Sequence, residues 1–79
     1  MKVLIVIRRS PAQRFLVKLH TDKLVREMAT LINKGRHSKA IVMALSKGSF
    51  ERQITDEDIS NVKADVILTE HNASWDLMK

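Results

Sequence analysis

Two short basic stretches contain the residues best suited to binding chemistry. Residues 8–14, RRSPAQR, hold three arginines around a Ser-Pro, and residues 33–39, NKGRHSK, hold two lysines, an arginine and a histidine. Guanidinium and ammonium groups donate charge-assisted hydrogen bonds to phosphates and carboxylates, and binding to a polyanion also releases its counterions. The candidate binding residues are therefore Arg8, Arg9, Arg14, Lys34, Arg36, His37 and Lys39.

The positive charge is concentrated in the first half of the chain. The 79 residues carry a formal net charge of +5. Residues 1–49 contain eleven lysines and arginines against two acidic residues, a net of +9, whereas residues 50–79 contain three against seven, a net of −4. An uneven field of this kind attracts polyanions to one region of the surface. The partner predicted from charge is a nucleic acid or an acidic protein surface.

The sequence contains no catalytic or cofactor motif. Cysteine is absent, and His20, His37 and His71 lack the spacing of metal ligands. The two glycines cannot form a phosphate-cradling loop, and no serine has the glycines of a nucleophile elbow around it. We therefore expect no metal, no cofactor and no enzymatic activity. A small basic ribonuclease is the remaining enzymatic alternative, because such enzymes act through scattered Arg, Lys and His side chains.

Length and composition predict one small folded domain over residues 1–79. A chain this short buries only about 60% of the surface that it exposes when unfolded, so it cannot divide its core in two. With 44% hydrophobic and 29% charged residues it is too apolar to be disordered. The apolar run at residues 2–7 is far too short to cross a bilayer, which predicts a cytoplasmic protein without membrane contact. The core is expected over residues 1–70, with residues 71–79 as a tail.

A helix over residues 22–34 is the element with the strongest periodicity. Leu24, Val25, Met28, Leu31 and Ile32 form one apolar stripe at the helical spacing. The helix has a suitable N-cap at residue 21 and a glycine at residue 35 to end it. It is the one principal helix that the sequence predicts.

Short apolar runs predict the strands of an α+β fold. Residues 3–7, 40–45 and 65–69 indicate strands, and residues 49–54 indicate a fourth that forms a hairpin with residues 40–45. Residues 55–58 indicate a helical turn. Residues 10–20 fit either a helix that begins at Pro11 or a strand after a turn, and we favour the strand. The predicted fold is a small antiparallel-rich sheet of four to five strands with the helix on one face, in the order β-β-α-β-β-β.

The hairpin interpretation brings the two basic stretches to the same end of the domain. The first strand runs towards residues 8–14, the second returns, and the helix then runs back to end at residues 33–39. The acidic turn at residues 56–58 either neutralises part of this basic end or lies across the sheet from it.

The first strand is apolar on both faces, although a single helix covers only one. Val3 and Ile5 lie on one face, and Leu4 and Val6 lie on the other. The tail, with Trp75, Leu77 and Met78, is the preferred cover for the second face. The alternatives are a homodimer through this face or a bound target protein.

These observations favour a small non-enzymatic regulator that binds nucleic-acid backbone without reading bases. Aromatic residues are only 4% of the chain and tyrosine is absent, which argues against base stacking. The alternative is an inhibitor or adaptor that docks on an acidic surface of a partner protein. The sequence does not distinguish DNA from RNA.

The helical stripe yields a test of the core. Met28 lies at its centre, so Met28→Asp should place an unpaired charge in the core and abolish cooperative folding. Thermal unfolding followed by circular dichroism measures this. A cooperative transition at the wild-type temperature would show that the stripe is not part of the core.

Overall fold

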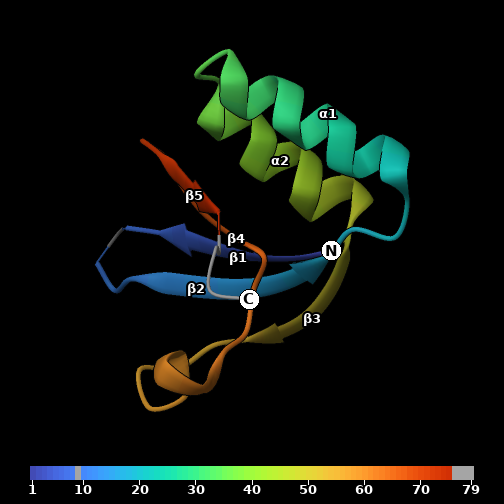
Figure 1. Ribbon diagram of the computed structural model, residues 1–79. Coiled ribbons are helices and arrows are strands. Elements are labelled where there is room, and N and C mark those ends of the chain that lie inside the picture. Colours follow the sequence, from blue (N-terminus) through green and yellow to red (C-terminus); the bar gives the residue numbers. More distant parts are fainter. Residues whose placement is uncertain (9, 76–79) are drawn as a thin grey trace.

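The computed structural model of the chain describes residues 1–8 and 10–75 and shows five strands and two helices (Figure 1). The elements are β1 (Lys2–Ile7), β2 (Gln13–Lys18), α1 (Asp22–Asn33), α2 (His37–Lys47), β3 (Ser49–Gln53), the 3-10 turn η1 (Ile59–Asn61), β4 (Val66–Thr69) and β5 (Ala73–Trp75). The α+β class is confirmed, and the number of strands lies within the predicted range.

The strands form one mixed sheet in the order β3-β2-β1-β4-β5. The pairs β1–β2, β2–β3 and β4–β5 are antiparallel, whereas β1 and β4 are parallel. The β1–β2 hairpin, with Val3 opposite Val17, confirms the strand interpretation of residues 10–20. β1 therefore lies at the centre of the sheet, and β4 reaches it from a distant part of the chain.

The predicted strand at residues 40–45 is wrong, because this segment belongs to α2. An uninterrupted apolar run fits a buried strand or a buried helix equally well. In the structure Ala40, Ile41, Met43 and Ala44 are buried together, at positions that share one face of a helix. The fold therefore has two helices and the order β-β-α-α-β-β-β, and Gly48 caps α2 instead of turning a hairpin.

The predicted ends of α1 are confirmed by its capping contacts. The Thr21 side chain accepts a hydrogen bond from the Leu24 amide at 3.2 Å. At the other end Gly35 has a φ of 71°, which glycine adopts without steric cost. The Gly35 amide donates to the Ile32 carbonyl at 3.0 Å, and the Arg36 amide donates to the Leu31 carbonyl at 2.8 Å. This is a Schellman motif, and it turns the chain directly into α2.

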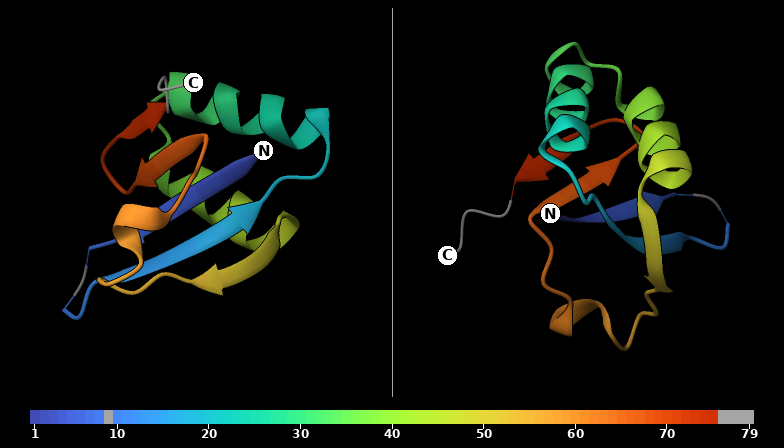
Figure 2. Two further views of the ribbon diagram at one scale, coloured as in Figure 1. Left: turned by 60° about the horizontal axis from the view of Figure 1, so that its bottom comes forward. Right: turned by 90° about the vertical axis from the view of Figure 1, so that its right-hand side faces the viewer.

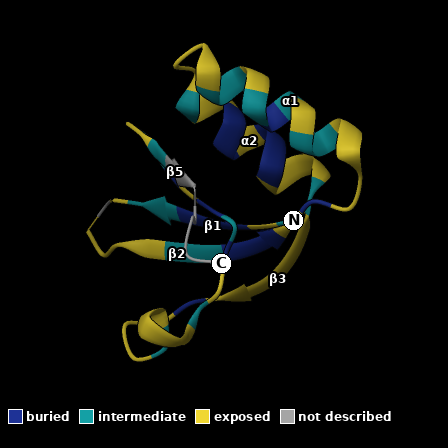
Figure 3. Cartoon of the chain, viewed as in Figure 1, coloured by how far each residue is buried: buried dark blue, intermediate teal, exposed yellow. Residues whose placement is uncertain are grey.

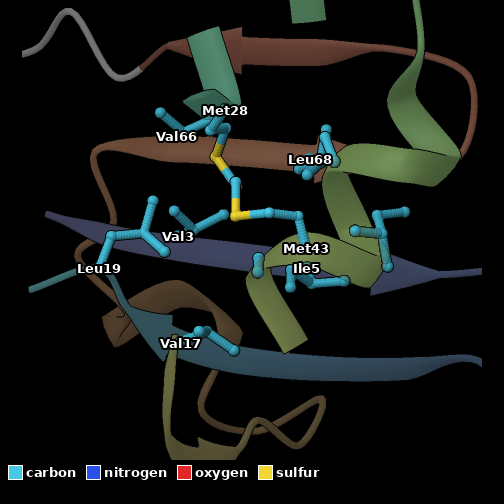
Figure 4. Close-up of a cluster of buried hydrophobic side chains, with 11 residues drawn as sticks. Val3, Ile5, Val17, Leu19, Met28, Met43, Val66 and Leu68 are labelled. Carbon is cyan, nitrogen blue, oxygen red and sulfur yellow. The ribbon is translucent and has the colours of Figure 1, made fainter. Parts of the chain in front are cut away.

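The main core lies between the two helices and one face of the sheet (Figure 3). Met28 of α1 and Met43 of α2 point towards one another above the strands (Figure 4). Beneath them lie buried strand side chains, namely Val3, Ile5, Val17, Val66 and Leu68. Met28 is fully buried, as the stripe predicts.

The second face of the sheet is covered by the segment between β3 and β4. Side chains of this segment and of the strands form a second, smaller hydrophobic cluster. Its members are Leu4, Leu16, Ile54 and Ala64, with Val6 and Val62 packed against them. This segment therefore covers Leu4 and Leu16, on the face for which the sequence predicted cover by the tail. Trp75 instead belongs to β5, where its backbone is paired with Val66, whereas Leu77 and Met78 lie outside the described residues. Ile67, on the same face, remains 40% exposed.

The junction of α2 and β3 leaves no room for a side chain at Gly48. A Cβ atom there would lie 2.5 Å from Val17 Cγ1 and 2.6 Å from the Ala44 carbonyl oxygen. Because one of these neighbours is backbone, Gly48→Ala should lower the free energy of unfolding by about 1 to 3 kcal/mol in chemical denaturation.

Gly35→Asn is the matched control, because a Cβ there meets nothing within 4 Å and asparagine tolerates positive φ. This control should change stability by less than about 1 kcal/mol. Equal losses for the two variants would contradict the steric explanation.

Candidate binding site at the basic end

Three chain reversals lie at one end of the domain. They are the loop between β1 and β2, the turn between α1 and α2, and the turn between β4 and β5 (Figures 1 and 2). The first and third lie together because β1 and β4 are parallel neighbours, so both strands end at the same edge. α1 runs back over the sheet towards this end, which brings the turn at residues 34–36 to it. Both predicted basic stretches are therefore at this end.

Glu70 lies between the two basic stretches. It lines a concavity of about 190 Å³ together with Arg8, His71 and residues of its own turn. It also lines a second concavity, of about 470 Å³, formed by residues 35–39. Glu70 is therefore shared by a concavity that includes Arg36, His37 and Lys39 and by one that includes Arg8.

The backbone around Glu70 is held by a hydrogen-bonded turn. Thr69 Oγ1 donates to Asn72 Oδ1 at 2.7 Å and accepts from the Asn72 amide at 3.1 Å. The Thr69 amide also donates to the Asn72 carbonyl at 2.8 Å. These bonds close the connection between β4 and β5 and fix where Glu70 leaves the sheet.

Four of the predicted cations at this end, Arg8, Lys34, Arg36 and Lys39, are exposed. None of them forms an ion pair with a carboxylate of residues 1–8 and 10–75. Elsewhere, Lys2 Nζ lies 3.7 Å from Glu51 Oε2, and Lys47 Nζ lies 3.3 Å from Glu27 Oε1. The unpaired cations around Glu70 are therefore available to an anionic ligand.

The other two predicted arginines are not part of this group. Arg14 lies opposite Val6 in the β1–β2 ladder, on the face that the second cluster covers, and forms an ion pair with Asp56. The acidic turn thus neutralises Arg14, as one of the two sequence-based alternatives proposed. Arg9 lies outside the described residues.

Glu70 is not among the residues that the sequence indicates, because it is neither a cation nor part of a known motif. The signal was its position directly after the apolar run at residues 65–69, at the end of a strand. That position becomes informative only when the strand is known to be parallel to β1. No His, Asp or Glu cluster capable of holding a metal ion occurs within the described part of the chain.

An apolar groove borders the basic end. It is lined by Ile7, Ile41, Val42 and Leu45, with Ser38 and Glu70 at its margin, and it has a volume of about 320 Å³. Val42 is 65% exposed and Leu45 is 43% exposed. The groove forms because α2 has apolar side chains on two sides. One side packs on the sheet, and Val42 and Leu45 on the other side remain exposed.

No protein-family model, curated protein or solved structure matches this chain. Among the described residues, neither helix has the length and apolar composition needed to cross a membrane.

The Arg14–Asp56 pair is exposed on the Asp56 side, so it should contribute little to stability. The Asp56 side chain is 86% exposed, and that of Arg14 is 25% exposed. A double-mutant cycle with Arg14→Ala and Asp56→Ala should give a coupling energy of about 0.2 to 1 kcal/mol, decreasing with added salt. A coupling above about 2 kcal/mol would show that the pair is desolvated and structural.

Proposed function

We propose that this protein is a small non-enzymatic nucleic-acid-binding module that holds the sugar-phosphate backbone at its basic end. The observation that carries the proposal is the placement of Arg8, Arg36 and Lys39 in two concavities that share Glu70, all without an ion-pair partner among the described residues. Cations that come from separate turns of a rigid scaffold can contact successive phosphates of one strand. Lys34 and His37 extend the same surface, whereas Arg14 is held by Asp56.

The placement of Phe15 and Phe50 supports backbone recognition over base recognition. Phe15 and Phe50 contact each other on β2 and β3, with ring centroids 6.0 Å apart. Neither ring lines the concavities around Glu70. Single-strand readers of the sheet type stack bases on aromatic side chains. We therefore infer contacts to phosphates that are independent of base sequence.

A protein partner is the second candidate, and the apolar groove beside α2 favours it. Exposed Val42 and Leu45 next to unpaired cations would suit an acidic partner that also inserts an apolar side chain. For such a partner, loss of the surrounding charges would slow association more than it would speed dissociation.

The salt dependence of binding tests the proposed function. With about four phosphate contacts, log affinity for a single-stranded oligonucleotide of about 12 nucleotides should fall with log salt at a slope of about −3. Replacing Arg36 and Lys39 together by glutamine should weaken binding to every sequence by a similar factor and bring the slope to about −1.5. Gel shift or fluorescence anisotropy measures both quantities, and the oligonucleotide should remain uncut.

Lys18→Gln with Lys23→Gln is the matched control, because both side chains are exposed at the opposite end of the domain. This variant has the same net charge as the first one, and it should retain the wild-type slope. An equal loss in both variants would show that net charge alone drives binding. The absence of any complex at low salt would favour the protein partner.

A further inference from the structure

Glu70 is an unusual residue to find at the centre of a polyanion-binding surface. It lines concavities together with Arg8 on one side and with Arg36 and Lys39 on the other. Nevertheless it forms no ion pair or hydrogen bond with any described residue. Its carboxylate therefore has no direct partner among the described residues, and a phosphate placed against it would be repelled.

The chemistry of the two nucleic-acid backbones decides what can compensate Glu70. Phosphate and deoxyribose within a DNA strand offer only hydrogen-bond acceptors, so Glu70 can only repel that backbone. Ribose adds a single donor per nucleotide, the 2′-hydroxyl, and this group distinguishes RNA from DNA at a protein surface. A carboxylate placed beside phosphate-binding groups also accepts the ribose 2′-hydroxyl in dinucleotide-binding folds. The order of charges on the protein, with Glu70 between two groups of cations, thus matches the order of groups along RNA, in which a ribose with its 2′-hydroxyl lies between two phosphates.

We propose that the basic end selects RNA over DNA, with Glu70 accepting a hydrogen bond from a ribose 2′-hydroxyl between phosphates held by Arg8 and by Arg36 with Lys39. This inference rests on the proposed function, because it assigns the class of nucleic acid to the same site. The Thr69–Asn72 turn fixes the backbone of Glu70 at the end of β4, and the residue is half-buried. The turn therefore fixes the position from which the Glu70 side chain leaves the sheet at the basic end.

The test compares three single-stranded oligonucleotides of one base sequence: RNA, DNA and 2′-O-methyl RNA. The 2′-O-methyl strand keeps the sugar geometry of RNA but lacks the donor. The wild-type protein should bind RNA about fivefold to tenfold more tightly than either of the other two, the effect expected of one hydrogen bond. Fluorescence anisotropy at constant salt measures all three affinities.

Glu70→Ala should abolish the preference, mainly because the affinities for DNA and 2′-O-methyl RNA increase when the repelling charge is removed. Glu70→Gln keeps the shape of the side chain and an acceptor oxygen, so it should retain about half of the preference on a logarithmic scale. Glu57→Ala is the matched control, since Glu57 is an exposed carboxylate outside the site and should leave the preference unchanged. Circular dichroism verifies that each variant is folded.

The outcomes separate this inference from the function on which it rests. If the wild-type protein binds all three strands equally, or if the preference persists in Glu70→Ala, the role of Glu70 is wrong while backbone binding stands. If RNA and 2′-O-methyl RNA bind equally well but DNA binds less well, sugar geometry and not the hydroxyl explains the preference. If none of the three strands binds, the proposed function itself fails.

Discussion

Burial of β1 on both faces is the constraint on which the rest of the structure depends. Val3 and Ile5 are fully buried on the helix side, and Leu4 is 5% exposed on the other side. A central strand of this kind needs a neighbour at each edge and a layer over each face. β2 and β4 occupy the edges, the two helices cover one face, and residues 54–64 cover the other.

The parallel pairing of β1 with β4 creates the candidate site. The chain from β1 to β4 forms a hairpin strand, two helices and an edge strand before it returns beside β1. Because parallel strands end at the same edge, Arg8 after β1 and Glu70 after β4 become neighbours although they are distant in sequence. The helical hairpin then adds the turn at residues 34–36 and the basic first turn of α2 at the same end. The combination of charges at this end is thus a product of topology.

The lysines and arginines in the first half of the chain fall into two groups, those that form ion pairs with carboxylates and those that do not. Residues far from the basic end, such as Lys2 and Lys47, lie beside carboxylates, and so does Arg14 on the opposite face of the sheet. The cations around Glu70 form no ion pair with any carboxylate of the described residues. α2 contributes to both kinds of surface there, since its first turn carries Lys39 and its outer side carries Val42. Electrostatic and apolar surfaces therefore adjoin at the same end.

The sequence by itself determined the α+β class, α1 with both of its ends and the alternation of faces in β1, whereas the β1–β2 hairpin was the favoured one of two interpretations. These features follow from local periodicity and capping, which act over a few residues. Only the tertiary structure decided that residues 40–45 are helical and that residues 54–64 cover the second face. The apolar run alone fits both conformations, and the choice depends on which of its side chains find a partner layer. The tertiary structure also decided that Arg14 lies apart from Arg8 and that Glu70 lies between the basic turns. The sequence could not predict either placement, because long-range strand pairing leaves no periodic signal in it.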